Sequence, residues 1–327
     1  MKSTAFLFAE AAIFAAILAI AAIGPPPASA PPVAVGWTLR IASTAPTVAD
    51  LESAFAAIDY DFRAIRDGER PVPRVRVDTM PEDLSQVPEV ARRKSLFFAS
   101  VLPLILAVNE QIAHERELVE GVRRKLRLGE AVTDDERQAL TKIAHEYEVI
   151  DQDALEEIDV TSTEILDRLD RRVAPIPVSL ALAQAAEESA WGMSRFAVEG
   201  NAIFGQWVWN DDAGIVPELR DTGARHSIRA FKDLYESTRV YAHNLNTHWA
   251  YRDFRRARAT MLSAGALNGQ ELAATLLRYS ERGQAYVEAL RKIIRGNGLA
   301  PLDDARFSSG QSAPPALGSQ TANAGPM

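Results

Sequence analysis

Residues 178–192 have the sequence VSLALAQAAEESAWG, an apolar run of leucine and alanine with two adjacent glutamates near its end. Proline is favoured just before a helix and glycine just after one, and Pro177 and Gly192 stand at these positions. The pattern therefore predicts a helix over residues 178–191, with both glutamates in its last turn.

Only one of the two glutamates can share a helix face with the polar and aromatic residues nearby, because successive helical residues point about 100° apart. Glu188 lies four residues after Gln184 and three before Trp191, whereas Glu187 falls on the leucine and alanine stripe. The negative end of the helix dipole favours a protonated glutamate by only about 0.3–1 kcal/mol. Burial beside Trp191 and the alanines would have to supply the rest of the pKa shift that a general acid needs.

The chain after this segment is predicted to be helical beyond a region of turns. Residues 205–230 lack a helical period and contain the turn sequences NDDAG and DTG, which predict loops and a short β-hairpin. Helices are expected after this region at residues 233–247, 252–263, 269–279 and 284–295.

The chain before Pro175 is also predicted to be largely helical. Its expected elements are a helix at 47–58, an extended connector at 60–85, a long helix from Pro88 past Arg127, and helices near 134–148 and 162–172. Thr47, and the capping boxes that begin at Thr133 and Thr161, open three of these helices. Pro103 lies inside the long helix and should kink or break it.

Composition excludes several classes of function. The chain has 327 residues, a net charge of −8 and no cysteine. The negative charge argues against a dedicated nucleic-acid binder, since such a protein needs a basic face. The lack of cysteine excludes disulfide scaffolds, cysteine-ligated metals, thiol nucleophiles and an acylated cysteine anchor. No P-loop or HExxH sequence is present, and we expect neither a metal nor a cofactor.

Charge and proline content divide the chain into regions. Residues 31–174 carry a balance of −9 and residues 175–300 a balance of +2, and the sign changes at the Pro-x-Pro sequence of residues 175–177. We therefore expect a helical N-terminal region at 31–174 and a second domain at 175–300. Residues 301–327 are rich in serine, glycine, proline and alanine, which predicts a disordered tail.

Residues 1–30 have the organisation of an export signal. A positive start is followed by the apolar segment Ala5–Ile23 and by small residues at 28–30. Pro31 would follow the cleavage site, where proline fits a signal peptidase poorly. About 19 apolar residues span roughly 28 Å as a helix, so an uncleaved membrane anchor is the alternative. Both interpretations place the rest of the chain outside the cytoplasm, in the periplasm or cell envelope.

Four of the five tryptophans lie within one segment of the C-terminal half. They are Trp191, Trp207, Trp209 and Trp249. Aromatic rings on loops suit sugars, because the C–H faces of a sugar ring stack on aromatic faces. Packing in the core is the alternative role for these rings.

Several motifs carry a resemblance to a known family. The sequence AQAAEESAWG at 183–192, followed by EGNAIFGQW at 199–207, closely resembles the peptidoglycan-cleaving N-acetylglucosaminidases related to the flagellar muramidase FlgJ. Within that group the chain is most similar to the Bax proteins. NLNTHWAY at 244–251, YSERG at 279–283 and LPLIL at 102–106 with Asn109 extend the resemblance to roughly residues 50–300.

The resemblance implies a mainly α, lysozyme-like fold with a small β-hairpin lobe, and hydrolysis of the β-1,4 bond after N-acetylglucosamine in peptidoglycan. It assigns Glu188 as the general acid, in agreement with the helix-face argument. For the second catalytic group it implies Glu218 on the hairpin, with Asp211 and Asp212 as alternatives. The substrate's own N-acetyl group could replace a second carboxylate, so retention or inversion stays open. Tyr251 would line the cleft and stabilise the transition state.

The resemblance also suggests which residues contact the substrate. The expected substrate-binding residues are Gln184, Trp191, Asn201, Phe204, Trp207 and His248. Phe204 is as consistent with packing in the core as with the floor of a cleft.

Two other functions stay open from the sequence. A lytic transglycosylase shares the fold and the catalytic glutamate, but such enzymes usually carry GLMQ where this chain has FGQW at 204–207. A wall-binding scaffold with an inactive hydrolase domain would be signalled by the loss of Glu188, which is present. The expected partner is the glycan strand of peptidoglycan, with no nucleic acid. Protein partners stay open, and the acidic region 31–174 could be a partner-docking or inhibitory element.

Overall fold

The computed structural model describes residues 36–151, 158–208, 214–215 and 227–308. The proposed export signal and the glutamate and aspartates considered for the second catalytic group (Glu218, Asp211 and Asp212) lie outside these ranges, as does Trp209. Within the described part the fold is mainly helical with a few short strands, which confirms the fold class expected from the sequence.

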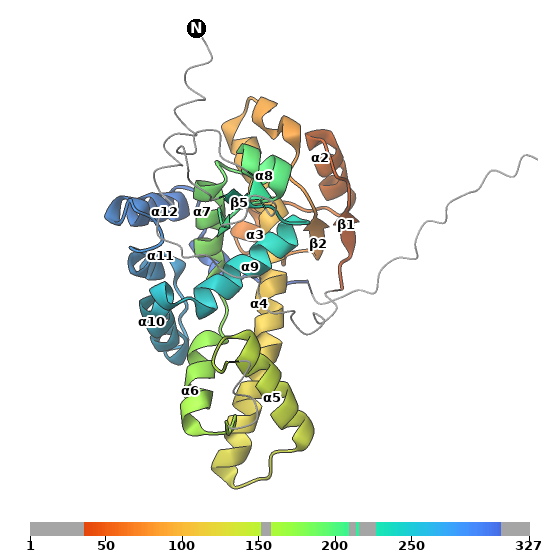
Figure 1. Cartoon of the computed structure of the whole chain (residues 1–327). Coiled ribbons are helices and arrows are strands. Elements are labelled where there is room, and N and C mark those ends of the chain that lie inside the picture. The colour runs from red at the N-terminus through yellow and green to blue at the C-terminus, as the bar shows by residue number, and fades with distance from the viewer. Residues whose placement is uncertain (1–35, 152–157, 209–213, 216–226, 309–327) are drawn as a thin grey trace, which may run out of the picture.

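Figure 1 shows the elements in chain order. The first half contains β1 (Leu39–Ile41), α2 (Val48–Ala57), α3 (Phe62–Arg66), β2 (Val75–Val77), the 3-10 helix η1 (Glu82–Gln86), α4 (Val90–Leu128), α5 (Asp134–Glu146) and α6 (Thr163–Arg172). The second half contains α7 (Val178–Glu188), α8 (Arg195–Gly200), β3 (Trp207–Val208), β4 (Gly214–Ile215), β5 (Ser227–Arg229), α9 (Leu234–Thr247), η4 (Trp249–Tyr251), α10 (Arg252–Ser263), α11 (Gly269–Leu272), η5 (Ala273–Thr275), α12 (Gln284–Gly296) and η6 (Ala300–Asp304).

Helix α4 is the longest element and joins two parts of the molecule (Figure 1). Its first part packs against α7, α9 and β2, and its last part carries α5 and α6 as an arm. An 18-residue window of α4 has a mean hydropathy of 1.7, so its length and composition would allow it to cross a membrane. However, 78% of that window is buried inside the protein, as expected for a core helix.

Pro103 lies inside α4 without ending it, so the expected break is wrong. Proline has no N–H to donate to the carbonyl four residues earlier, which here is that of Ala99. The hydroxyl of Tyr60 donates to this carbonyl at 3.0 Å. A buried tyrosine from outside the helix therefore supplies the hydrogen bond that proline removes.

Helix α7 is surrounded by elements from both halves of the chain. It packs against α4, α11, α12 and η6, and one hydrophobic core contains residues from either side of position 174. The side chain of Asn109 on α4 accepts from the backbone N–H of Ile176 at 2.9 Å and donates to its carbonyl at 2.8 Å. The boundary expected at 174/175 therefore does not separate two independent cores.

The N-terminus of α7 is capped from the end of the described chain. The carboxylate of Asp303 accepts from the backbone N–H of Ser179 at 2.8 Å and from its hydroxyl at 2.9 Å. It also accepts from the N–H of Gly269 at 2.8 Å. Residues 301–308 were expected to begin a disordered tail, and this is wrong, because Asp303 supplies buried polar contacts that hold this segment against α7 and α11.

The small sheet has three antiparallel strands in the order β3-β5-β4, with Trp207 and Ile215 both opposite Ile228. This agrees with the expected small β lobe. A second, two-stranded parallel sheet pairs β1 with β2, in a region where an extended connector was expected at 60–85.

Local helix signals were right in some places and wrong in others. The capping boxes at Thr47 and Thr133 are formed, and α10 has the expected bounds. The box expected at Thr161 is absent: Ser162 is the N-cap of α6, and the Thr161 hydroxyl instead donates to Asp159 at 2.6 Å. The connector expected at 60–85 contains α3, β2 and η1.

We predict that Tyr60→Phe destabilises the protein by about 1–3 kcal/mol, because the Ala99 carbonyl would be buried without a donor. In a Pro103→Ala background the same change should cost less, since residue 103 would then donate to Ala99. Urea unfolding of the four proteins of this double-mutant cycle measures the difference. Equal costs of Tyr60→Phe in the two backgrounds would contradict this role.

Candidate active site

Glu188 is the last residue of α7 and is 8% exposed. Burial raises the pKa of its carboxyl to about 7, and the charge of Glu187 adds to this effect. A hydrogen bond from Tyr286 acts in the opposite direction. The carboxyl is therefore protonated in a large fraction of molecules at neutral pH, as a general acid must be.

Three buried side chains connect α7 with α9 and α12 through hydrogen bonds that end at Glu188. The hydroxyl of Tyr241 donates to Gln184 Oε1 at 2.7 Å. The Gln184 Nε2 amide donates to the hydroxyl of Tyr286 at 3.1 Å. Tyr286 in turn donates to Glu188 Oε1 at 2.7 Å. One oxygen of the carboxyl is thus held by a continuous hydrogen-bond chain.

Aromatic stacking fixes the two tyrosines of this chain. The ring of Phe204 stacks on Tyr241 with centroids 3.8 Å apart and planes 8° apart. Tyr279 stacks on Tyr286 at 5.5 Å and 2°. Tyr251 contacts Tyr279 at 5.7 Å. Because these rings are buried, Glu188 lies in an aromatic environment that disfavours its charged form.

Glu187, the neighbouring carboxyl, has a different environment. It pairs with Arg282, a residue of the YSERG motif, and its side chain is 23% exposed. The structure therefore separates the two adjacent glutamates, one paired with an arginine and one buried among tyrosines. The role of Glu188 as general acid stays a prediction.

The expected helical relation between Glu188 and Trp191 is wrong. Helix α7 ends at Glu188, and Ala190 and Trp191 both have left-handed backbone conformations, with φ of 49° and 63°. The hydroxyl of Ser189 accepts from the N–H of Gly192 at 2.8 Å, which stabilises this turn. The turn directs the chain away from the helix axis before Trp191.

Trp191 packs against the first part of α4. Its ring makes edge contacts with Phe97 and Phe98, at 6.1 and 5.4 Å between centroids. The ammonium of Lys94 lies 4.2 Å from the centre of the ring. These contacts show that the Trp191 ring packs against α4, directly after the end of α7. Its role in substrate binding stays a prediction.

Gln184, Asn201 and Phe204 were expected to bind substrate. Gln184 is fully buried, and both ends of its amide bond to tyrosine hydroxyls. Asn201 is the left-handed C-cap of α8, and its Nδ2 donates to the carbonyl of Phe231 at 3.1 Å. Phe204 is 1% exposed beneath Tyr241. The contacts described for all three residues are with other buried groups of the protein. Their contact with substrate stays a prediction.

His248 and Tyr251 lie together at the end of α9. The ring of His248 is 5.7 Å from Tyr251 and 5.4 Å from the exposed Trp249. Burial lowers the pKa of His248, so the ring is neutral near pH 7. Burial and the charge of Glu188 both raise the pKa of Tyr251, which keeps its hydroxyl protonated. Trp207 belongs to β3, but the structure does not describe its side chain, so its role in substrate binding stays a prediction.

The residues around Glu188 that sequence reasoning did not assign to the site are Tyr241, Tyr279 and Tyr286. Tyr241 and Tyr286 lie 57 and 102 residues from Gln184 along the chain, so no local pattern connects them. Tyr279 was visible only as part of the YSERG motif.

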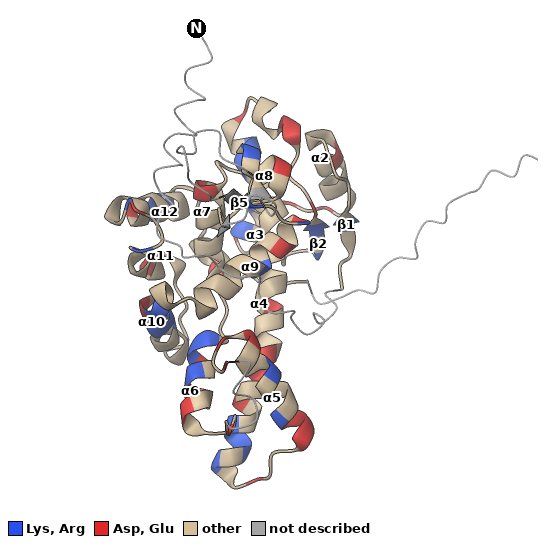
Figure 2. Ribbon diagram, in the orientation of Figure 1, with Lys and Arg blue, Asp and Glu red and all other residues tan. Residues whose placement is uncertain are grey.

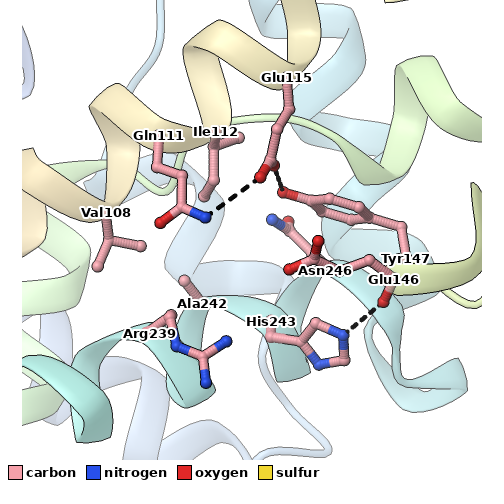
Figure 3. Close-up of a pocket in the computed structure, with 10 residues that line it drawn as sticks. All are labelled: Val108, Gln111, Ile112, Glu115, Glu146, Tyr147, Arg239, Ala242, His243 and Asn246. Atoms are coloured by element: carbon pink, nitrogen blue, oxygen red, sulfur yellow. Dashed lines mark hydrogen bonds between the residues drawn. The ribbon is translucent and has the colours of Figure 1, made fainter. Parts of the chain in front are cut away.

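Two half-buried carboxyls, Glu115 and Glu146, line a pocket between α4, the end of α5 and α9 (Figure 3). The Tyr147 hydroxyl donates to Glu115 at 2.5 Å. The Nε2 atom of His243 donates to the backbone carbonyl of Glu146 at 2.7 Å. Burial raises the pKa of Glu146 to about 7. The pocket volume of about 20 Å³ fits roughly one water molecule, so it cannot hold a sugar ring.

Charge is unevenly distributed over the ribbon (Figure 2). Most of α7 is uncharged, whereas the arm formed by α5, α6 and the end of α4 carries many charged residues of both signs. Among the described residues, no group of three or more histidine, aspartate and glutamate side chains has the geometry of a metal site.

Comparison with known proteins identifies a matching family and a relative. Residues 165–299 match the Glucosaminidase family, described as mannosyl-glycoprotein endo-beta-N-acetylglucosaminidase. Protein bax of Escherichia coli (strain K12) is 31% identical over 220 residues, which cover 66% of this chain and 73% of that protein. No solved structure matches the chain.

We predict that Glu188→Gln stabilises the protein above neutral pH. The pKa of Glu188 is about 7 in the folded protein against an ordinary value of 4.5, so the folded state binds more protons between these pH values. Stability is therefore lost as pH rises from 4.5 to 7, by up to about 3 kcal/mol from this group.

The neutral amide removes this loss, so the gain should be about 1–3 kcal/mol at pH 8 and much smaller at pH 5. Urea unfolding at the two pH values measures it, with Glu187→Gln as the matched control on the neighbouring residue. A gain in Glu188→Gln that is equal at pH 5 and pH 8 would refute the explanation.

Proposed function

Because the chain belongs to the Bax family of glucosaminidase-domain proteins, we propose that it is an exported endo-β-N-acetylglucosaminidase that hydrolyses peptidoglycan. The proposed bond is the β-1,4 linkage on the reducing side of N-acetylglucosamine. The observation that carries the proposal is a single carboxyl, Glu188, buried at the end of α7 with its pKa raised to about 7.

In the proposed mechanism Glu188 protonates the glycosidic oxygen as the bond to the leaving sugar breaks. Glycoside cleavage passes through an oxocarbenium-like transition state, and protonation of the leaving group is needed because a sugar alkoxide is a poor leaving group. A carboxyl with a pKa near 7 is still protonated at the pH of reaction and acidic enough to transfer its proton. After transfer, Tyr286 donates to the new carboxylate and stabilises it.

The second catalytic group stays a proposal between two chemistries. A carboxylate from the hairpin region, with Glu218 the first candidate, would activate water on the opposite face of the sugar. Alternatively, the N-acetyl carbonyl of the substrate would attack the anomeric carbon. Tyr251 is proposed to stabilise the transition state with its hydroxyl, whose raised pKa keeps the proton in place. The side chain is 1% exposed in the structure, so direct donation to the sugar would require the substrate to gain access to it.

The proposed location is the cell envelope. A peptidoglycan substrate lies outside the cytoplasm, and residues 1–30 have the composition of a signal or membrane anchor. Residues 175–300 are proposed to carry the catalytic groups, and residues 31–174 to support them through α4.

The test is mass spectrometry of fragments released from purified peptidoglycan by the full chain and by Glu188→Gln. We expect the parent protein to release fragments that end in reducible N-acetylglucosamine. Glu188→Gln should lower the rate by about 10²–10⁴-fold, the usual contribution of a general acid. Glu187→Gln, the matched control, should retain most of the activity because Glu187 pairs with Arg282 outside the proposed chemistry.

Other products would point to other functions. Anhydro-muramic ends would identify a lytic transglycosylase. Binding to peptidoglycan without release of fragments by any of the three proteins would identify a wall-binding scaffold. Undiminished release by Glu188→Gln would show that another residue is the acid.

A further inference from the structure

We propose that Tyr241, Gln184 and Tyr286 are positioning residues that act as one directed hydrogen-bond chain on Glu188. The chain holds Glu188 Oε1 as an acceptor, so the proton used in catalysis is carried by Oε2. This inference rests on the proposed role of Glu188 as general acid, but the hydrogen-bond chain can be tested without substrate.

The direction of the chain follows from the chemistry of its amide. An amide oxygen only accepts and an amide nitrogen only donates. Gln184 Oε1 accepts from Tyr241, so Gln184 Nε2 is the group that faces Tyr286 and donates to its oxygen. The single proton of Tyr286 is then free to point at Glu188 Oε1, 2.7 Å away. Each group therefore fixes the orientation of the next.

Burial prevents water from taking the place of these hydrogen-bond partners. Gln184 is 0% exposed, and Tyr241 and Tyr286 are each 1% exposed. Water therefore has no direct access to exchange with these three groups. The stacked rings of Phe204 and Tyr279 cover the two tyrosines and restrict their motion. The chain is preorganised, so Glu188 needs no rearrangement before proton transfer.

The consequence for the acid is a defined proton position. A carboxyl oxygen that already accepts a strong hydrogen bond is the poorer site for the proton. The proton of neutral Glu188 therefore resides on Oε2, the oxygen that Tyr286 does not contact. Loss of that proton is assisted, because the hydrogen bond from Tyr286 is stronger to the carboxylate than to the neutral acid. The chain thus limits the effect of burial and keeps the acid usable near neutral pH.

Gln184 has a different role in this scheme from the one expected from sequence. The resemblance to the glucosaminidase family suggested that it contacts the sugar. Both ends of its amide are bonded to tyrosine hydroxyls. Gln184 therefore links Tyr241 on α9 to Tyr286 on α12 and orients the hydroxyl of Tyr286. Its effect on the reaction would pass through Tyr286 and Glu188.

The experiment is an NMR titration of the Glu188 carboxyl in the full chain labelled with ¹³C at glutamate side-chain carboxyls. The signal is assigned by its absence in Glu188→Gln. In Tyr286→Phe the pKa of Glu188 should rise by about one unit, because the carboxylate loses its donor. Tyr241→Phe should raise it by less, since Gln184 and Tyr286 remain. The alkaline limb of kcat/KM against pH should move upward with the titration.

Tyr279→Phe is the matched control. Tyr279 stacks on Tyr286 and is equally buried, but its hydroxyl faces the carbonyl of Phe204 at 3.4 Å. A merely structural role of the tyrosine cluster would make Tyr279→Phe and Tyr286→Phe shift the pKa alike. If Tyr286→Phe does not fold, Gln184→Met provides the same titration, with an upward shift again expected.

The sign of the shift decides the proposal. A fall in the pKa in Tyr286→Phe would show that Tyr286 accepts the proton of neutral Glu188, which overturns the direction of the chain. No change in Tyr241→Phe would overturn the participation of Tyr241. Because these titrations need no substrate, they separate failure of the hydrogen-bond chain from failure of the proposed activity, which the peptidoglycan assay alone decides.

Discussion

The burial of one carboxyl at the C-terminal end of an apolar helix is the constraint around which the rest of the site is arranged. Glu188 would be costly to bury as a charged group, because it sits at the negative end of the helix dipole and among aromatic rings. The protein reduces this cost by keeping the carboxyl largely protonated and by giving one of its oxygens a donor, Tyr286. The same compromise leaves a proton that can be transferred. Stability and proposed activity thus make opposite demands on Glu188.

Helix α7 can hold Glu188 in this position only because both halves of the chain support it. Asp303 accepts from the backbone N–H of Ser179 in its first turn, Asn109 fixes Ile176 two residues before it, and α4 packs against it. All of these contacts come from outside residues 175–300. The part of the chain that matches the Glucosaminidase family, residues 165–299, therefore leaves out the cap at Asp303 and the core contributed by α4. The N-terminal region has a structural reason to accompany the catalytic one.

The sequence predicted features that depend on neighbouring residues. The capping box at Thr133 and the bounds of α10 follow from short-range signals, and both are confirmed. The choice of Glu188 over Glu187 rested on helix geometry, and the structure gives the two carboxyls different environments, one buried and one paired with Arg282. The same geometry failed at Trp191, because the hydroxyl of Ser189 and the left-handed turn end the helix before the period can continue.

Features that depend on distant residues could not be predicted in this way. Pro103 alone predicts a broken helix, and the compensating hydroxyl of Tyr60 comes from 39 residues away from Ala99. Tyr286 is 98 residues from Glu188, and nothing in the sequence around either one indicates the contact. A raised pKa alone would not have located the site either, since Glu146 has a similar value in a pocket too small for a sugar. What distinguishes Glu188 from Glu146 is a tyrosine donor held by a buried hydrogen-bond chain, and that chain exists only once α7, α9 and α12 have packed together.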